Sequence, residues 1–364
     1  MRIIVTGGLG FIGSAVVRRL IARTGHEVTT LDARTYAASP EALGEALRHP
    51  RHRLLEGDVR DGRAVRQAFA AARPDVVMHL AAESHVDRSI DGPAEFVSTN
   101  VVGTLVVLEA AREHWSSLPP PERDAFRVHH VSTDEVFGAL GHGDPPFHAG
   151  TRYDPRSPYA ATKAASDHLV RAWHHTYGLP AFVSNTTNNY GPWQFPEKLI
   201  PLVALNALEG KPLPVYGDGS NVRDWVHVED HAEALVLCAE RGRPGETYCL
   251  GGRGERSNLE VVRAICGVLD RLRPDPAGPR ERLVAFVADR PGHDLRYAMD
   301  PSEAEAALGW RARRSFEEGL EETLRWYLDH EAWWRPIRER RYAGARLGTA
   351  APASAPARAD APAA

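Results

Sequence analysis

A glycine-rich turn near the N-terminus constrains the fold of this 364-residue chain more than any other segment. The β-branched run Ile3–Thr6 leads straight into the turn, and an apolar helical pattern follows it. Gly8, Gly10 and Gly13 satisfy G-x-G-x-x-G, and Gly7 in place of Gly8 gives the variant with one more intervening residue. Glycine allows a tight turn and a close backbone approach, so helix N-terminal amides can meet a pyrophosphate. The turn therefore predicts the first βαβ unit of a dinucleotide-binding fold.

An acidic residue at the end of the second expected strand supports this prediction. Asp32 follows the glycine turn by about 20 residues, where a carboxylate can accept hydrogen bonds from an adenosine ribose. Its charge would also repel a 2′-phosphate, which favours NAD over NADP, although the nearby Arg34 keeps NADP open. Asp58, after the third expected strand, is a candidate for the adenine edge, with a solvated turn residue as the alternative.

Strand-like and helix-like segments alternate through the first half of the chain. The segments expected to be strands are Ile3–Thr6, Glu27–Asp32, Arg53–Glu56, Val76–Leu80, Val128–Ser132 and Ala181–Asn185. The segments expected to be helices are Phe11–Thr24, Ala64–Ala72, Ala94–His114 and Tyr159–Tyr177. This alternation is typical of a parallel sheet covered on both faces. We therefore expect a Rossmann-type doubly wound α/β fold with a smaller C-terminal substrate-binding lobe.

The same pattern suggests a division of the chain. Residues 1–190 are expected to form the NAD-binding domain, with part of 220–250 returning to it. Residues 191–342, where the pattern loosens, are expected to form mainly the substrate-binding lobe. The Ala/Pro-rich segment 343–364 has nothing to form a core and is expected to be disordered.

Composition narrows the kind of partner that the protein can have. A net charge of −4 leaves no basic surplus for nucleic acid or an anionic membrane, so an anionic substrate needs a few placed cations. The three cysteines lack a CxxC spacing and suit a reducing compartment. No signal-peptide pattern or long apolar run is evident, and we expect a cytoplasmic protein.

Tyr159 and Lys163 lie four residues apart, so in a helix they share one face. A lysine beside a tyrosine favours the phenolate, and we expect the pKa of Tyr159 to be lowered. Such a phenolate can take a hydroxyl proton while a hydride leaves the same carbon for nicotinamide. The alternative interpretation is an ordinary pair on a helix surface. The dinucleotide-binding pattern that precedes the pair favours the catalytic interpretation.

Two adjacent carboxyl groups follow the fifth expected strand, in the sequence Ser132-Thr133-Asp134-Glu135. Carboxyl ends of parallel strands face the ligand crevice of an open α/β sheet. A simple dehydrogenase needs only a hydroxyl group there, so the carboxyl groups of Asp134 and Glu135 indicate chemistry beyond hydride transfer. They suit an acid and a base acting on neighbouring carbons, while a solvated turn is the alternative.

Beyond these motifs, residues 1 to about 335 resemble the dTDP-glucose 4,6-dehydratase family of extended short-chain dehydrogenases/reductases. The matching blocks are residues 79–89, 132–138, 157–159, 163–169, 188–192, 195–201, 216–219, 221–225 and 289–294. The resemblance implies a tightly bound, recycled NAD, a nucleotide-sugar substrate and a homodimer formed through helices that flank the sheet.

It also implies a role for individual residues. Thr133 and Lys163 would assist Tyr159 in deprotonating the sugar's 4-hydroxyl, Glu135 would remove the C5 proton, and Asp134 would protonate the departing 6-hydroxyl. The implied NAD contacts are Gly7, Gly10, Phe11, Ile12, Gly13, Asp32, Asp58, Val59, Ala81, Thr99, Tyr159, Lys163 and Asn189. The implied substrate contacts are Ser84, Thr133, Asn188, Lys198, Leu199, Pro214, Tyr216, Arg223, Asn258, Arg290 and His293. Arg223 and Arg290 suit a diphosphate because guanidinium groups bind such oxygens bidentately.

The sequence departs from the family pattern before the Asn188 block. Thr186-Thr187 replaces Cys-Ser, and Ser184-Asn185 replaces Thr-Arg, which removes a positive charge that we expect near the nucleotide crevice. The histidine pairs at 129–130 and 174–175 lack metal-ligand spacing, so we expect no metal. Three other functions stay open at this point: a 4,6-dehydratase for a UDP-, GDP- or CDP-linked sugar, a 4-epimerase, and a catalytically silent NAD-binding regulator.

Overall fold

The fold is described from a computed structural model, which covers residues 1–340, 342, 344 and 347. The expectation of disorder at 343–364 therefore falls outside the described residues, apart from Gly344 and Leu347.

The core element is one seven-stranded parallel sheet with the strand order β11-β6-β5-β4-β1-β2-β3. Its strands are β1 (Arg2–Thr6), β2 (Glu27–Asp32), β3 (His52–Glu56), β4 (Val76–His79), β5 (Arg127–Thr133), β6 (Ala181–Thr186) and β11 (Thr247–Leu250). The order reverses between β1 and β4, which opens a crevice at the carboxyl ends of these strands. The doubly wound α/β fold expected from the sequence is confirmed.

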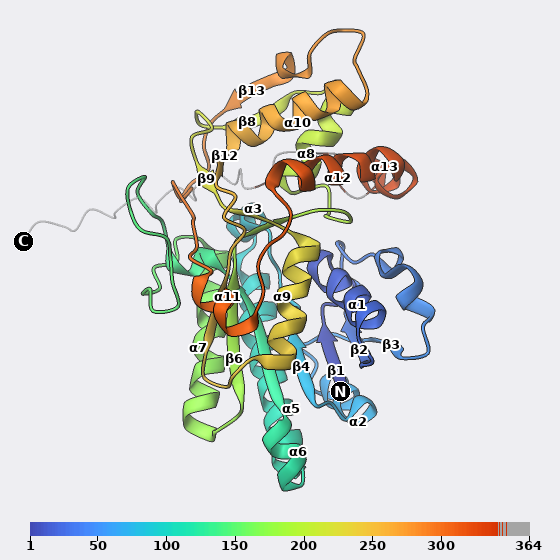
Figure 1. The fold of residues 1–364 in the computed structure, drawn as a ribbon, viewed down its shortest axis with the longest axis vertical. Coiled ribbons are helices and arrows are strands. Elements are labelled where there is room, and N and C mark those ends of the chain that lie inside the picture. Colours follow the sequence, from blue (N-terminus) through green and yellow to red (C-terminus); the bar gives the residue numbers. More distant parts are fainter. Residues whose placement is uncertain (341, 343, 345–346, 348–364) are drawn as a thin grey trace, which may run out of the picture.

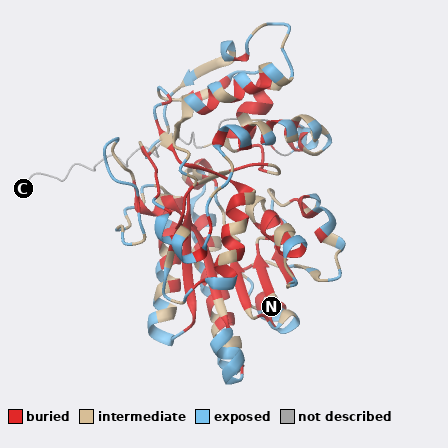
Figure 2. Cartoon of the chain, in the orientation of Figure 1, coloured by how far each residue is buried: buried red, intermediate tan, exposed pale blue. Residues whose placement is uncertain are grey.

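Helices cover both faces of this sheet (Figure 1). One apolar cluster joins the sheet to α1 (Phe11–Arg23), α9 (Val228–Arg241) and α11 (Ser302–Leu308). A second cluster joins the opposite face to α2 (Gly62–Ala72), α5 (Gly103–Ser117) and α7 (Pro158–Tyr177). Figure 2 shows the strands as the most continuously buried part of the chain, as a sheet covered on both sides requires.

The helix expected at Ala94–His114 is longer and less regular in the structure. It runs from Pro93 to Ser117 as α4 (Pro93–Phe96), a π-helical segment η2 (Val97–Val102) and α5. By length and composition this run could cross a membrane, so the expectation that no apolar stretch is long enough was wrong. Its buried residues belong to the cluster under the sheet, which accounts for its apolar character.

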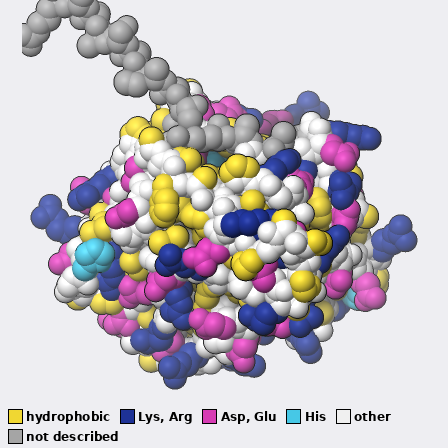
Figure 3. Space-filling model, turned by 90° about the horizontal axis from the view of Figure 1, so that it is seen from above, with side chains coloured by type: hydrophobic (Ala, Val, Ile, Leu, Met, Phe, Trp, Pro, Cys, Tyr) yellow, Lys and Arg dark blue, Asp and Glu magenta, His cyan; other side chains and the backbone are white. Residues whose placement is uncertain are grey.

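A smaller lobe stands over the carboxyl edge of the sheet (Figure 1). Its helices are α8 (Leu199–Leu208), α10 (Asn258–Leu272), α12 (Phe316–Asp329) and α13 (Glu331–Arg340). Its strand pairs are β10 (Trp225–His227) with β7 (Asn188–Tyr190), β12 (Arg256–Ser257) with β9 (Val222–Arg223), and β13 (Val284–Val287) with β8 (Leu213–Tyr216). A third apolar cluster fills the space between these elements. On the face of the molecule seen in Figure 3, basic and acidic side chains are interspersed over the coloured part.

The remaining short elements lie in the segments between the longer ones. They are η1 (Pro40–Arg48), α3 (Val86–Asp91), α6 (Pro120–Ala125), η3 (Asp134–Phe137) and η4 (Arg280–Leu283). The helix α9 and the strand β11 pack with the sheet although they follow β9 and β10 of the lobe in the chain. The division into residues 1–190 and 191–342 stays a prediction.

Candidate active site

The glycine turn forms a cradle that no larger side chain could enter. A Cβ atom on Gly13 would lie 2.1 Å from the carbonyl oxygen of Gly7, and one on Gly7 would lie 2.8 Å from the Ala81 backbone. Gly7 also has a φ of 71°, a conformation that glycine adopts without strain. The turn leads directly into α1, so the free amides of its first turn face the crevice between β1 and β4. This backbone fits the pyrophosphate of a dinucleotide.

Asp32 ends β2 beside this cradle. Its carboxylate accepts hydrogen bonds from the amides of Leu9 (3.0 Å) and Arg34 (2.8 Å). Burial raises its pKa, and these two amides act in the opposite direction. The guanidinium of Arg34 is exposed and pairs with Glu56 at 3.2 Å, and its charge also acts to lower the pKa of Asp32. Asp58 pairs with Arg60 at 2.7 Å, and this hydrogen bond lowers the pKa of Asp58.

One cavity extends from the glycine cradle to the carboxyl ends of β5 and β6. All thirteen sequence-predicted NAD contacts line it: Gly7, Gly10, Phe11, Ile12, Gly13, Asp32, Asp58, Val59, Ala81, Thr99, Tyr159, Lys163 and Asn189. The catalytic candidates Thr133, Asp134 and Glu135 line the same cavity. The structure thus brings together residues that are more than 150 positions apart in the sequence.

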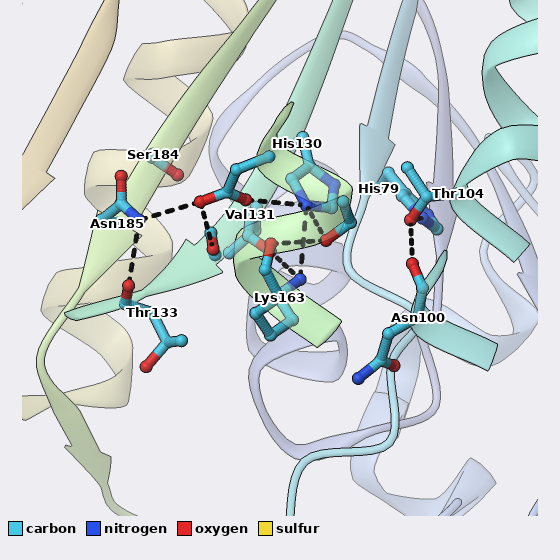
Figure 4. A network of polar contacts seen from close by, with 12 residues as sticks. His79, Asn100, Thr104, His130, Val131, Thr133, Lys163, Ser184 and Asn185 are labelled. Carbon is cyan, nitrogen blue, oxygen red and sulfur yellow. Dashed lines mark hydrogen bonds and ion pairs between the residues drawn. The ribbon is translucent and has the colours of Figure 1, made fainter. Parts of the chain in front are cut away.

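Tyr159 and Lys163 lie on the first turns of α7. Ser157 caps this helix by accepting a hydrogen bond from the Ala160 amide, and Pro158 occupies its first turn. The ammonium of Lys163 donates to the Val131 carbonyl at 2.9 Å and contacts His130 Nε2 at 3.4 Å (Figure 4). Burial lowers the pKa of Lys163 to about 8.

The expected lowering of the Tyr159 pKa was wrong for the protein in this state. Burial raises the pKa of Tyr159, and the charge of Glu135 raises it further, while a hydrogen bond with Thr133 acts in the opposite direction. Lys163 is directed at the β5 backbone and His130 instead of the phenol oxygen. Phenolate formation therefore needs favourable charge in addition to that of this lysine.

Thr133 ends β5, and Asp134 and Glu135 begin the turn η3. The Thr133 hydroxyl accepts from the Glu135 amide at 3.3 Å and donates to Asp134 Oδ1 at 3.2 Å. Asp134 is only 2% exposed, and its Oδ2 is buried without a hydrogen-bond partner among the described residues. An unsatisfied buried oxygen is costly, so Oδ2 is suited to contact a bound molecule.

The two carboxyl groups have different surroundings. Burial raises the pKa of Asp134 well above its usual value, and the neighbouring Glu135 adds to this. Burial also raises the pKa of Glu135, but the charges of Arg290, Arg223 and Lys198 oppose it. Both carboxyl pKa values are raised, Asp134 further than Glu135, so Asp134 is the better suited of the two to act as the acid and Glu135 as the base.

The predicted substrate contacts divide into two groups. Ser84, Thr133, Asn188 and Lys198 line the cavity, and the Lys198 ammonium donates to the Ser84 carbonyl at 2.7 Å. The others lie in the lobe outside its lining: Leu199, Pro214, Tyr216, Arg223, Asn258, Arg290 and His293. Arg223 and Arg290 are nevertheless close enough for their charges to act on Glu135. Their assignment to the substrate stays a prediction.

A carboxylate that the sequence reasoning missed ties the lobe to α3. Asp87 pairs with Arg290 at 2.8 Å and accepts a hydrogen bond from the Tyr216 hydroxyl at 3.1 Å. The Nε atom of Arg290 is buried without a partner. Asp87 therefore holds Arg290 in place. Arg290 is predicted to bind the diphosphate, and its Nε–H group is available for this among the described residues.

The two departures from the family pattern have different positions. Thr186 and Thr187 line the cavity. Asn185 was expected near the nucleotide crevice, but it is fully buried and donates to the Thr133 carbonyl at 2.9 Å and to Asp167 at 3.3 Å. That expectation was wrong because the Asn185 side chain of β6 points towards β5 and α7, beneath the cavity (Figure 4).

Asn100, beside the site, carried no sequence signal of its own, whereas the histidine pairs at 129–130 and 174–175 did. Asn100, in the π-helical segment, bonds the Glu83 backbone and the Thr162 hydroxyl, and π-helical turns often mark functional positions. His129 bonds Ser184 at 2.8 Å, and His174 contacts the Leu179 carbonyl at 2.9 Å. Within the described residues, no three histidine, cysteine or acidic side chains form a group that could hold a metal ion.

Fold and site together define a class of protein: a dinucleotide-dependent enzyme with a Tyr-Lys pair and an added acid–base pair. The family model described as GDP-mannose 4,6 dehydratase matches residues 4–323. A dTDP-glucose 4,6-dehydratase of Escherichia coli is 52% identical, with 96% of this chain and 99% of the relative covered. A dTDP-glucose 4,6-dehydratase of Neisseria meningitidis is 54% identical, with 96% of this chain and 99% of the relative covered.

Solved structures agree with these sequence matches. The Streptomyces venezuelae dTDP-glucose 4,6-dehydratase DesIV, solved with NAD bound, has a TM-score of 0.84 and 44% identity, covering 93% of this chain and all of that one. A Thermus thermophilus UDP-glucose 4-epimerase in complex with NAD has a TM-score of 0.79 and 30% identity, covering 91% and 100%. The chain belongs to the dTDP-glucose 4,6-dehydratase family.

Proposed function

We propose that this protein is an NAD-dependent hydro-lyase that converts dTDP-glucose to dTDP-4-keto-6-deoxyglucose. The observation that carries the proposal is the convergence of Asp134 and Glu135 with Tyr159 and Lys163 on the cavity that begins at the glycine cradle. A 4-epimerase needs the tyrosine and lysine but has no use for two further carboxyl groups. A silent regulator needs none of the four.

The cradle, Asp32 and the crevice between β1 and β4 support NAD as the cofactor. NAD held by the glycine cradle and Asp32 would supply a hydride acceptor for C4 of the sugar and a hydride donor for C6 within the same turnover. Tyr159 takes the proton of the 4-hydroxyl with the Thr133 hydroxyl beside it, and the Lys163 ammonium lies one turn further along α7, on the Val131 carbonyl. The resulting ketone acidifies the neighbouring C5 proton.

Glu135 removes the C5 proton and gives a proton back to C5 when the hydride returns to C6; three nearby cations oppose the rise of its pKa by burial. Asp134 gives its proton to the 6-hydroxyl, which then leaves as water. The buried, unpartnered Oδ2 of Asp134 supports this role, because a bound hydroxyl would supply its missing partner. Ser84, Asn188 and Lys198 hold the substrate in the cavity, and Arg223 and Arg290 hold its diphosphate from the lobe.

Product analysis with matched nucleotide sugars tests this function. The purified protein should convert dTDP-glucose to a keto sugar with the alkaline absorbance of a 4-keto-6-deoxy product, without external reductant. UDP-glucose, assayed in parallel, should react at least about tenfold more slowly, a difference of about 1.4 kcal/mol in transition-state binding. A 4-epimer without loss of water would instead select the epimerase, and inertness towards all substrates would select the regulator.

We further propose that the protein is a cytoplasmic homodimer. Apolar side chains are exposed along the helical run of η2 and α5: Val97 is 48%, Val102 43% and Leu105 36% exposed. Exposed apolar groups on one helix face favour association, and a second copy would bury them against the same helices.

Replacing both Val102 and Leu105 by glutamate should therefore yield a monomer. Buried charges at an interface of two copies are unpaired and repel each other. Light scattering coupled to size-exclusion chromatography measures the mass directly. Phe286→Glu in the lobe serves as the control and should leave the dimer intact, because the Phe286 side chain is 60% exposed. A wild-type protein that is monomeric at micromolar concentration would contradict the proposal.

A further inference from the structure

A buried polar layer lies beneath the catalytic residues, between β5, β6 and α7 (Figure 4). Its centre is Asp167, which is fully buried one helical turn after Lys163. The Asp167 carboxylate contacts His130 Nε2 at 3.2 Å and accepts hydrogen bonds from Ser132 (2.9 Å) and Tyr153 (2.8 Å). The mechanism described so far makes no use of this group.

Through the Asp167 carboxylate, this polar layer is connected both to Lys163 on α7 and to Thr133 at the end of β5. His130 Nε2, which contacts Asp167, also lies 3.4 Å from the Lys163 ammonium. On the other side, Asn185 contacts Asp167 at 3.3 Å and donates to the Thr133 carbonyl at 2.9 Å. Asp167 thus contacts the neighbours of both Lys163 and Thr133.

Two groups of this layer, Asp167 and Lys163, carry opposite charges. Burial lowers the pKa of His130 to about 4, so its ring is neutral near pH 7. Burial raises the pKa of Asp167, but the hydrogen bond from His130 and the charge of Lys163 outweigh this and hold it below its usual value. The Asp167 carboxylate and the Lys163 ammonium are therefore the ionised pair, with a neutral imidazole between them.

The other titratable groups packed around Lys163 do not replace this carboxylate. From β4, His79 is buried and neutral, because burial lowers its pKa well below the usual value. From η3, Asp134 favours its protonated form, and Glu135 faces three other cations. From α7 and the segment before it, the remaining groups are Tyr159, Tyr153 and Arg171, and Arg171 bonds the Tyr153 hydroxyl. A buried ammonium without a carboxylate nearby loses its proton.

We propose that Asp167 is a positioning residue of the active site: its carboxylate is the counter-charge that keeps Lys163 protonated, and its contacts hold the end of β5 against α7. This inference rests on the proposed function, because it assigns the charge state of Lys163 a role in turnover. It also gives the Asn185 departure a consequence. Where the family pattern has an arginine, this chain has a neutral amide, so the Asp167 charge is left to act on Lys163.

The test is the pH dependence of turnover in Asp167→Asn, a change that keeps the side-chain shape and removes the charge. The rate needs a protonated Lys163, so its alkaline limb reports the pKa of this lysine. Without Asp167 that limb should move to lower pH by about one unit, as expected for loss of an adjacent opposite charge. At pH values above the limb, kcat should fall about tenfold while KM changes by less than about twofold. The amount of bound NAD should not change, since the glycine cradle is untouched.

Two control variants separate charge from structural support. Tyr153→Phe removes one hydrogen bond to Asp167 but keeps the carboxylate, so the alkaline limb should stay in place. Asp230→Asn removes another buried carboxylate, which bonds Arg314 and the Arg313 amide instead of the groups of this layer, and should lower stability without moving the limb. An equal displacement of the limb in either control would overturn the proposal.

A second variant keeps the proposal testable if Asp167→Asn does not fold. Ser184→Thr combined with Asn185→Arg restores the residue pair of the family pattern and places a cation beside Asp167. The alkaline limb should then move in the same direction, because the carboxylate is shared with the new guanidinium. An unmoved limb in whichever of these variants folds would refute the role of Asp167. Absence of product from the wild-type protein would instead refute the proposed function.

Discussion

Glu135→Gln should lower the formation of the 4-keto-6-deoxy sugar by about a thousandfold, the middle of the range for loss of a general base. Glutamine has nearly the shape of glutamate but cannot accept the C5 proton. In the structure Glu135 is held through its backbone amide by Thr133, so the turn η3 should persist in the variant. The measurement is product formation together with exchange of the C5 hydrogen in deuterated water. Both should be lost together.

The control for this prediction is a carboxylate with an arginine partner outside the cavity. Glu255 pairs with Arg296 at 2.7 Å, and Glu255→Gln should keep turnover within about threefold of the wild type. Bound NAD should be unchanged in both variants. If Glu135→Gln still exchanged the C5 hydrogen at the wild-type rate, another group would be the base and our assignment would be wrong.

Gly13→Ala should remove bound NAD and destabilise the protein by about 3 kcal/mol, the upper part of the range for an overpacked position. The new Cβ would lie 2.1 Å from the Gly7 carbonyl oxygen, and both partners of this clash are backbone. To relieve it, α1 must move away from the turn, which displaces the amides that face the pyrophosphate. If roughly 3 kcal/mol of binding is lost, the Kd for NAD rises by about a hundredfold. Calorimetric titration of NAD and thermal unfolding measure the two effects.

Gly267→Ala provides a matched control for the glycine change. Gly267 is exposed in α10, and a Cβ there would meet no atom within 4 Å. Alanine is a better helix former than glycine, so this variant should keep NAD binding and gain up to about 1 kcal/mol of stability. Retention of full NAD binding by Gly13→Ala would contradict the role that we give the cradle.

Local sequence patterns determined the alternation of strands and helices in the first half of the chain and many of the residues that line the cavity. The glycine turn at residues 7–13, Asp32 and the pair Tyr159 and Lys163 could be interpreted without a structure, because each depends on spacing within one turn or helix. The β5 end could be predicted for the same reason, since Thr133 directly follows the strand-like segment Val128–Ser132. The structure moved most of these element boundaries by only one or two residues.

The state of each ionisable group, in contrast, depended on tertiary structure. Spacing placed Tyr159 and Lys163 on one face but could not show that Lys163 is directed to the Val131 carbonyl and that burial raises the Tyr159 pKa. Asn185 shows the same limit, because only the packing of β6 against β5 and α7 places it beside Asp167. The sequence by itself determined which chemical groups reach the sheet edge, since periodicity is local. Which of them are charged was decided by burial and by partners from distant segments, and these exist only in the folded chain.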